Sequence, residues 1–215
     1  MDDTPILKYA NDNNPLSDAK RKGMIKKASK AYEKFMDALG IDWKSDPNSA
    51  DTPTRVAKSF INDLASGCYD SPPKITTFDN NANYDGIVFD GNIDVKSFCS
   101  HHHLPFIGVA HVAYIPAADG QIIGLSKMNR AVEFFSRRPQ VQESLTMQIH
   151  GFLDEIIEGN EGVAVVIEAD HMCACVRGVR HNSSMMTSKI SGRFKEDPAT
   201  REEFYDFISR LKRLR

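Results

Sequence analysis

Side chains that could bind a metal ion gather at two places in the sequence. Cys99 and His102 lie three positions apart in the stretch FCSHHHLPF, a spacing common between zinc ligands, and His171, Cys173 and Cys175 follow in HMCACVRGV. Thiolate and imidazole favour zinc over magnesium or calcium, whose ligands are oxygens. A Cys-x-x-His pair also arises by chance, and Cys175 fits a buried apolar thiol equally well. The pattern predicts a zinc site without fixing its ligands.

Three consecutive histidines, His101, His102 and His103, occupy a stretch that reads as a β-strand. Successive side chains on a strand point to opposite faces, so the three rings cannot all point the same way. At least one of them must therefore differ in role from the others.

A second group of residues suits an anion. Ser126 stands where a helix is expected to begin, and Lys127 and Arg130 lie on one face of its first turns. The free N–H groups and positive dipole end of such a helix, with two cations added, suit a phosphate. A solvated basic helix end is the plainer explanation, but cations there oppose the dipole, so stability does not account for them. Glu143 lies at another expected helix start, where local electrostatics alone would favour a carboxylate.

The first third of the chain is predicted to be helical. Apolar residues recur at helical spacing from Ser17 to Leu39, where Gly40 follows as a stop signal. The stretch DTPTRVAKSFINDLASG predicts a second helix, in which Thr52 is the expected cap and Pro53 suits the first turn.

The pattern then changes to the alternation of strands, in GIVFDGNIDVKSFCS and PFIGVAHVAYIPAADGQIIGL, with a hairpin signal at Asp90–Gly91. Two helices are expected next, from Ser126 to Phe135 and from Pro139 onward, followed by strands in EGVAVVIEADHMCACVRGV and SSMMTSKISG. A last helix begins at Asp197–Pro198 or at a capping box from Thr200 to Glu203. Short turns between strands imply antiparallel pairing, so we predict an α+β fold with helices on one sheet face.

The composition fits a soluble globular chain. Of 215 residues, 41% are hydrophobic and 26% charged, and the net charge of -2 gives no indication of a nucleic-acid partner. No apolar run approaches the roughly 20 residues of a membrane span, and the N-terminus lacks the features of a signal peptide. We therefore expect a cytoplasmic protein with reduced cysteines and with no membrane or nucleic-acid partner.

Five separated motifs carry a family resemblance. The stretches CSHHHLPFIG, VAYIP, IIGLSKMNR, RRPQVQESLT and HMCACVRGV, in this order and at these intervals, resemble the GTP cyclohydrolase I family, and the match extends back to DTPTRVAKSF. The resemblance implies the tunnelling fold, a four-stranded antiparallel sheet with two helices on one face. It places this catalytic domain at residues 73–215, after an N-terminal helical region at residues 1–72.

The same resemblance implies an assembly. Subunits of this family join edge to edge into a β-barrel toroid, usually a homodecamer of two stacked pentamers with active sites at the interfaces. A lone domain with open sheet edges would tend to aggregate, so closure by oligomerisation also makes physical sense.

The resemblance further implies a zinc-dependent hydrolysis of GTP at C8 of the guanine. The implied zinc ligands are Cys99, His102 and Cys173, which leave a fourth position for water and bring its pKa to about 7. His101 is matched to the residue that protonates the imidazole-ring nitrogen of the base as the ring opens. Release of formate, an Amadori rearrangement of the ribose and ring closure would give 7,8-dihydroneopterin triphosphate, with His171 and Ser126 matched to residues near the ribose.

Substrate recognition is also implied by the resemblance. Glu143 would accept hydrogen bonds from the N1–H and 2-amino group of guanine, two donors that adenine lacks. The other implied binding positions are Gln142, Ile123, Gly124 and Leu125 beside the base, Lys127, Arg130 and Arg177 at the triphosphate, and Arg55 and Lys58 from a neighbouring subunit.

One position departs from the family, and two other functions stay open. Ser100 replaces the usual Glu between the Cys and the histidines, which removes a carboxylate beside the metal. A structural zinc module could use Cys175 as fourth ligand, since Cys173 and Cys175 would face the same side of a strand. A tunnelling-fold reductase acting on a deazaguanine nitrile, with a nucleophilic cysteine and a nicotinamide cofactor, is the second; the retained zinc set and phosphate cations argue against it.

Overall fold

The structure, a computed structural model, describes residues 7–182 and 184–213. The chain forms two compact units: the first takes the chain up to Pro72 together with Arg137–Pro139, and the second comprises Pro73–Ser136 and the chain from Gln140 onward. Within the described ranges, no helix is both long enough and apolar enough to cross a membrane.

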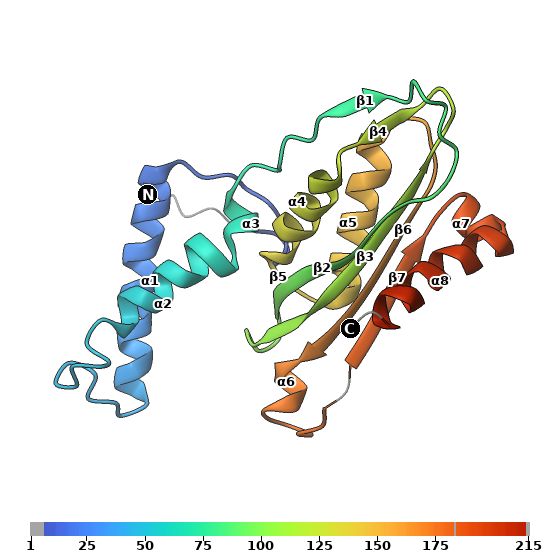
Figure 1. Cartoon of the computed structure of the whole chain (residues 1–215). Coiled ribbons are helices and arrows are strands. Elements are labelled where there is room, and N and C mark those ends of the chain that lie inside the picture. Colours follow the sequence, from blue (N-terminus) through green and yellow to red (C-terminus); the bar gives the residue numbers. More distant parts are fainter. Residues whose placement is uncertain (1–6, 183, 214–215) are drawn as a thin grey trace. The chain divides into compact units, whose positions relative to one another are not determined.

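The first unit is helical, as expected. Its elements are α1 (Asp18–Ala38), α2 (Thr52–Ser59), the π-helix η1 (Phe60–Leu64) and α3 (Ser66–Tyr69) (Figure 1). Ser17 caps α1 by accepting a hydrogen bond from the Lys20 amide. The cap expected at Thr52 is wrong, because Thr52 is already the first helical residue and Asp51 occupies the N-cap position without a side-chain hydrogen bond.

The second unit is a sheet with helices packed on it. Its strands are β1 (Thr77–Asp79), β2 (Val88–Cys99), β3 (Pro105–Pro116), β4 (Gln121–Ile123), β6 (Asn160–His171) and β7 (Ser184–Ile190), and the short β5 (Pro139–Gln140) joins the same sheet as β2. Its helices are α4 (Leu125–Ser136), α5 (Gln142–Ile156), α6 (Met172–Cys175), α7 (Arg193–Glu196) and α8 (Pro198–Arg213).

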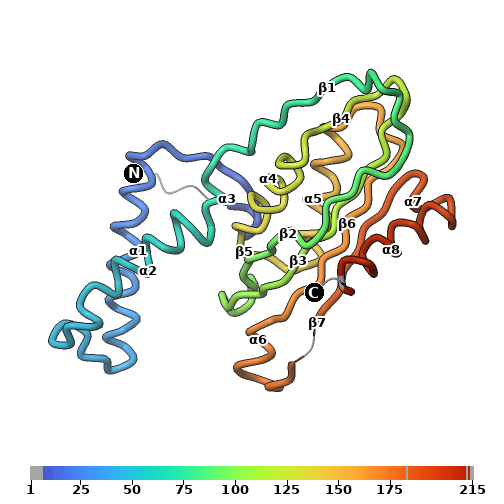
Figure 2. Tube along the Cα trace, viewed as in Figure 1, coloured from blue at the N-terminus to red at the C-terminus, as the bar shows by residue number. Residues whose placement is uncertain are grey.

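The main sheet has the order β5-β2-β3-β6-β7, and the four long strands pair antiparallel, as predicted. Figure 2 shows the traces of β2, β3 and β6 running side by side through this unit. The short β1 and β4 form a separate two-stranded sheet. Strand β3 lies between β2 and β6 and is antiparallel to both. The C-terminal ends of β2 and β6 therefore lie at the same end of the sheet.

The hairpin expected at Asp90–Gly91 is wrong. Strand β2 continues through this dipeptide, and the pairing shifts from Asp90 opposite Val112 to Ile93 opposite Ala110. Two residues of β2 therefore face one residue of β3, which is a β-bulge. The left-handed backbone of Asn92, with φ of 58°, accommodates the extra residue.

Apolar side chains cover both faces of the sheet. On one face, residues such as Val112 and Val165 pack under α4 and α5, as the predicted fold requires. On the other face, Ala113 and Val166 pack against Phe194 of α7 and against Phe204 and Ile208 of α8. Neighbouring residues on β3 and β6 point to opposite faces and are both apolar, so both faces of the sheet must be buried. Helices α4 and α5 bury one face, and the C-terminal helices α7 and α8 bury the other.

Candidate metal centre and substrate site

The three predicted metal ligands come from three different elements. Cys99 is the last residue of β2, His102 lies in the turn that follows, and Cys173 lies in α6 directly after β6. Strand β3 pairs with β2 through Pro105 and with β6 through Phe106, at its own first residues. The end of β2, the turn and the start of α6 therefore meet at one end of the sheet.

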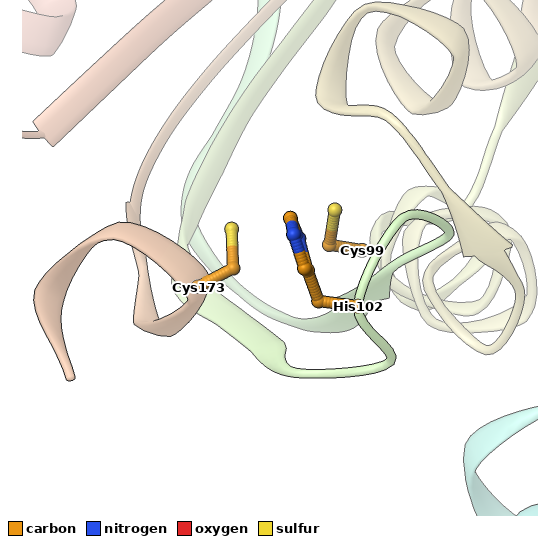
Figure 3. A group of neighbouring side chains, drawn as sticks. All are labelled: Cys99, His102 and Cys173. Carbon is orange, nitrogen blue, oxygen red and sulfur yellow. The ribbon is translucent and has the colours of Figure 1, made fainter. Parts of the chain in front are cut away.

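These three side chains form a group that can bind a metal ion. One ligand atom from each lies within 4.8 Å of the others, and Figure 3 shows both sulfur atoms and the imidazole ring pointing into a common space. Bonds of about 2.0 to 2.3 Å would let one ion bridge them after small side-chain movements. Burial raises the pKa of the Cys173 thiol, and the neighbouring Cys99 raises it further, while Arg177 lowers it. A divalent cation would stabilise the thiolate form that burial disfavours, so the two thiols and the imidazole fit a thiophilic metal.

Cys175 is not part of this group. The residues after His171 form the short helix α6, so Cys173 and Cys175 do not alternate along a strand. Residues two apart on a helix point in roughly opposite directions, about 200° around the axis. The expectation that both thiols face the same side is therefore wrong. In the part of the chain that the structure describes, the ligand group holds three protein donors.

The histidine run lies in a turn, and not on a strand as predicted. Strand β2 ends at Cys99, and the amide of His103 donates to the Cys99 carbonyl oxygen at 2.8 Å. The three rings have different neighbours: His101 Nδ1 lies 3.5 Å from the Cys99 sulfur, and the ring of His103 packs edge-on to Phe98. The three histidines thus differ in surroundings, although the turn and not strand alternation separates them.

His171 lies beside the metal group and is held on two sides. Its Nε2 is 2.8 Å from Oε1 of Gln142, and its ring stacks on Phe106 with centroids 4.8 Å apart. Burial lowers the pKa of His171, while the carboxylates of Glu143 and Asp170 act in the opposite direction. Glu143 itself is exposed in the first turn of α5. Sequence reasoning missed Phe106, although its antiparallel register with His171 follows once β3 and β6 are paired.

The predicted base and phosphate residues from Ile123 to Arg130 begin at the other end of the sheet. Ile123 ends β4, and both of its backbone polar groups contact the hydroxyl of Tyr114, which is buried on β3. Gly124 and Leu125 follow directly, then Ser126, Lys127 and Arg130 in the first turns of α4. Tyr114 is eight residues beyond Phe106 on β3, a distance of about 26 Å at 3.3 Å per residue. Ile123 therefore lies at the opposite end of β3 from Phe106.

The remaining predicted residues divide between the two units. Arg177 follows α6 and lies close enough to Cys173 to affect its thiol. Arg55 and Lys58 lie on α2 of the first unit, both exposed, with Arg55 paired to Asp51 at 3.2 Å. At Ser100 the backbone amide donates to the Gln140 carbonyl oxygen at 3.2 Å.

Comparison with known proteins gives one consistent result. A family model described as GTP cyclohydrolase I matches residues 28–209. The chain is 46% identical to GTP cyclohydrolase 1 of Flavobacterium johnsoniae over 205 residues, covering 93% of this chain and 90% of that protein. It is 42% identical to GTP cyclohydrolase 1 of Streptomyces avermitilis over 184 residues, covering 85% and 90% respectively.

Among solved structures, the apo form of the archaeosine synthase QueF-Like shows a TM-score of 0.37 and 12% identity, over 48% of this chain and 93% of that one. A likeness this low bears on neither fold nor function. The sequence matches are much stronger evidence, because they span most of both chains and contain the residues that build the metal group. The chain belongs to the GTP cyclohydrolase I family.

Proposed function

We propose that this protein hydrolyses GTP at C8, releases formate and forms 7,8-dihydroneopterin triphosphate, the first step of tetrahydrofolate and pterin biosynthesis. The observation that carries the proposal is the convergence of Cys99, His102 and Cys173 in a chain of this family. His101 contacts Cys99, and His171 lies two residues before Cys173. Zinc held by these three residues would supply Lewis-acid activation of water at neutral pH.

The proton transfers fall to the neighbouring histidines. His101, with Nδ1 at 3.5 Å from the Cys99 sulfur, is placed to protonate the ring nitrogen of the base as its bond to C8 breaks. His171 serves the later proton transfers at the ribose, where Ser126 also acts. His101 contacts Cys99 and His171 contacts Gln142, so the two histidines can serve separate proton transfers.

Substrate binding needs both ends of the sheet. Glu143, exposed near His171, accepts from the guanine N1–H and 2-amino group and so selects guanine over adenine. The triphosphate carries close to four negative charges, which five cations would balance. These cations are Lys127, Arg130, Arg177, Arg55 and Lys58.

A second copy of the chain completes the site in this proposal. Ile123, the first of the residues from Ile123 to Arg130, contacts Tyr114, which is about 26 Å along β3 from Phe106 at 3.3 Å per strand residue. Strand β7 ends the sheet order, so its outer edge is available to pair with another subunit. We expect a homodecamer of two stacked pentamers, with each active site formed between subunits.

A direct assay separates this function from the two alternatives. Purified, zinc-loaded protein is incubated with GTP and no reductant, and formate is measured; in parallel, nicotinamide oxidation is followed with a deazaguanine nitrile as substrate. We expect formate from GTP and no nicotinamide oxidation. Folded, zinc-loaded protein that releases no formate would refute the proposal, and oxidation of the nicotinamide would favour the reductase.

A further inference from the structure

Gln142 is fully buried at the first residue of α5, yet its carboxamide has polar neighbours on both sides. The amide nitrogen lies 3.0 Å from the Ile167 carbonyl oxygen, 3.0 Å from the Met185 carbonyl oxygen and 3.1 Å from Oγ1 of Thr187. The amide oxygen lies 2.8 Å from Nε2 of His171. The side chain thus connects strands β6 and β7 to the histidine.

The orientation of the carboxamide follows from these neighbours. A carbonyl oxygen accepts hydrogen bonds and cannot donate them, so the nitrogen of Gln142 must face Ile167 and Met185. The reverse orientation would place three oxygen atoms together in a buried place. The amide oxygen therefore faces His171, and since this oxygen can only accept, the proton of the contact lies on Nε2 of His171.

Two threonines fix the same orientation independently. Oγ1 of Thr146 donates to the backbone carbonyl oxygen of Gln142 at 2.9 Å. Its only proton is then used, so in the 2.7 Å contact between the two hydroxyls Thr187 is the donor. The oxygen of Thr187 in turn faces the side-chain amide nitrogen of Gln142, whose two protons are shared among three acceptors, so Thr187 can only accept in this contact. These three hydrogen bonds form a cycle that runs from the Gln142 side chain through Thr187 and Thr146 back to the Gln142 carbonyl oxygen. In each of them only one of the two partners can be the donor.

We propose that Gln142 is a positioning residue that holds neutral His171 in the tautomer protonated at Nε2, with the lone pair on Nδ1. In this tautomer the free lone pair of His171 is on Nδ1, while Nε2 stays bonded to Gln142. The stack on the fully buried Phe106 ring, at an interplanar angle of 9°, fixes the plane of the imidazole. In this proposal Gln142 acts through His171.

The assignment of the tautomer can be tested without activity. Nitrogen-15 NMR of zinc-loaded protein labelled in histidine distinguishes protonated from unprotonated ring nitrogens, and the His171→Asn variant identifies the His171 signals by their loss. We expect protonated Nε2 and unprotonated Nδ1 in the neutral ring. A neutral His171 that carries its proton on Nδ1 would overturn the proposal.

The catalytic consequence rests on the proposed function and is tested at Thr187, away from the metal ligands. Thr187→Val breaks the cycle, so we expect kcat for formate release to fall roughly tenfold or more, with zinc content and KM for GTP nearly unchanged. Thr187→Ser keeps the hydroxyl and should restore kcat. Ser188→Ala, at an exposed neighbouring position on β7, is the matched control and should leave kcat unchanged.

The two failures are distinguishable. An unchanged kcat in Thr187→Val would overturn the positioning role while the proposed function stands. Absence of formate release from the unaltered protein would refute the proposed function, and the NMR spectrum would still decide the tautomer.

Discussion

The Cys173 thiol of the metal group lies in a setting that disfavours its charged form. Burial raises the pKa of Cys173, and the neighbouring Cys99 raises it further. The sequence spacing predicted Cys99, His102 and Cys173 as ligands, and the structure brings these three together. The spacing could not exclude Cys175, because that depends on whether the chain turns into a helix after β6 or stays extended.

Zinc content separates these cysteines experimentally. We expect Cys173→Ser to lose most of its bound zinc, because two ligands remain, and Cys175→Ser to keep it, because Cys175 lies outside the ligand group. Elemental analysis of both purified variants beside the unaltered protein makes the comparison. Equal loss of zinc in the two variants would support a closed four-ligand structural site.

The buried imidazole of His150 makes the stability of the protein depend on pH. His150 is buried on α5, and its Nε2 lies 3.0 Å from the Ser191 hydroxyl. Burial lowers the pKa of His150, Lys189 lowers it further, and Asp154 acts in the opposite direction. The unfolded chain therefore binds a proton at higher pH than the folded chain does. Stability is complete above the unfolded pKa of about 6.5 and falls as the pH drops toward the folded pKa.

His150→Gln should weaken this dependence on pH. Thermal unfolding at pH 7.5 and at about pH 5.5 would show a smaller loss of Tm on acidification than in the unaltered protein. His171, whose pKa is also lowered, contributes equally to both proteins. A variant with the same loss of Tm on acidification as the unaltered protein would contradict the assignment.

At the scale of elements, β3 positions the candidate site, because it aligns the ends of β2 and β6 and carries both Phe106 and Tyr114. The sequence predicted these strands and their antiparallel pairing from alternation and short turns. It failed at Asp90–Gly91, because the same dipeptide suits a hairpin or a bulge and only the long-range pairing with β3 decides between them. The cycle of Gln142, Thr146 and Thr187 was also beyond prediction, since it joins residues that only the packing of α5 on β7 brings together.

Tyr114→Phe tests how β3 supports the start of α4. The Tyr114 hydroxyl accepts from the Ile123 amide at 3.0 Å and lies 3.4 Å from its carbonyl oxygen, to which it donates. Its loss leaves buried backbone groups unpaired, at a cost of about 1 to 3 kcal/mol of stability. Because Gly124 and Leu125 follow directly, we expect a higher KM for GTP with unchanged zinc content. Tyr205→Phe, at an exposed position on α8, is the control, and equal KM values in all three proteins would contradict the prediction.

At the scale of the whole molecule, the proposed function uses residues from both ends of β3. Phe106, at the end where the metal group lies, and Tyr114, which contacts Ile123, are about 26 Å apart at 3.3 Å per strand residue. The open edge at β7 offers a place where a second chain can pair. In the proposed function, assembly is therefore part of the active site and not merely a source of stability.

Mixed oligomers test whether the site is shared. Cys173→Ser removes the metal half and Arg130→Ala the phosphate half, so each variant alone should be nearly inactive. Co-expressed in equal amounts, they should regain roughly one quarter of the unaltered activity, because that share of sites combines two intact halves. Activity no greater than the sum of the separate variants, in oligomers shown to contain both chains, would mean that each chain holds its own complete site.

The central claim is that this chain opens the guanine ring of GTP by metal-dependent hydrolysis. The most direct measurement is formate release from GTP by the same protein preparation before chelation, after chelation and after zinc is returned, with bound metal measured each time. We expect formate release to disappear with the metal and to return in proportion to zinc bound. Formate release that persists in fully metal-free, folded protein, or its absence from zinc-loaded protein, would contradict the account.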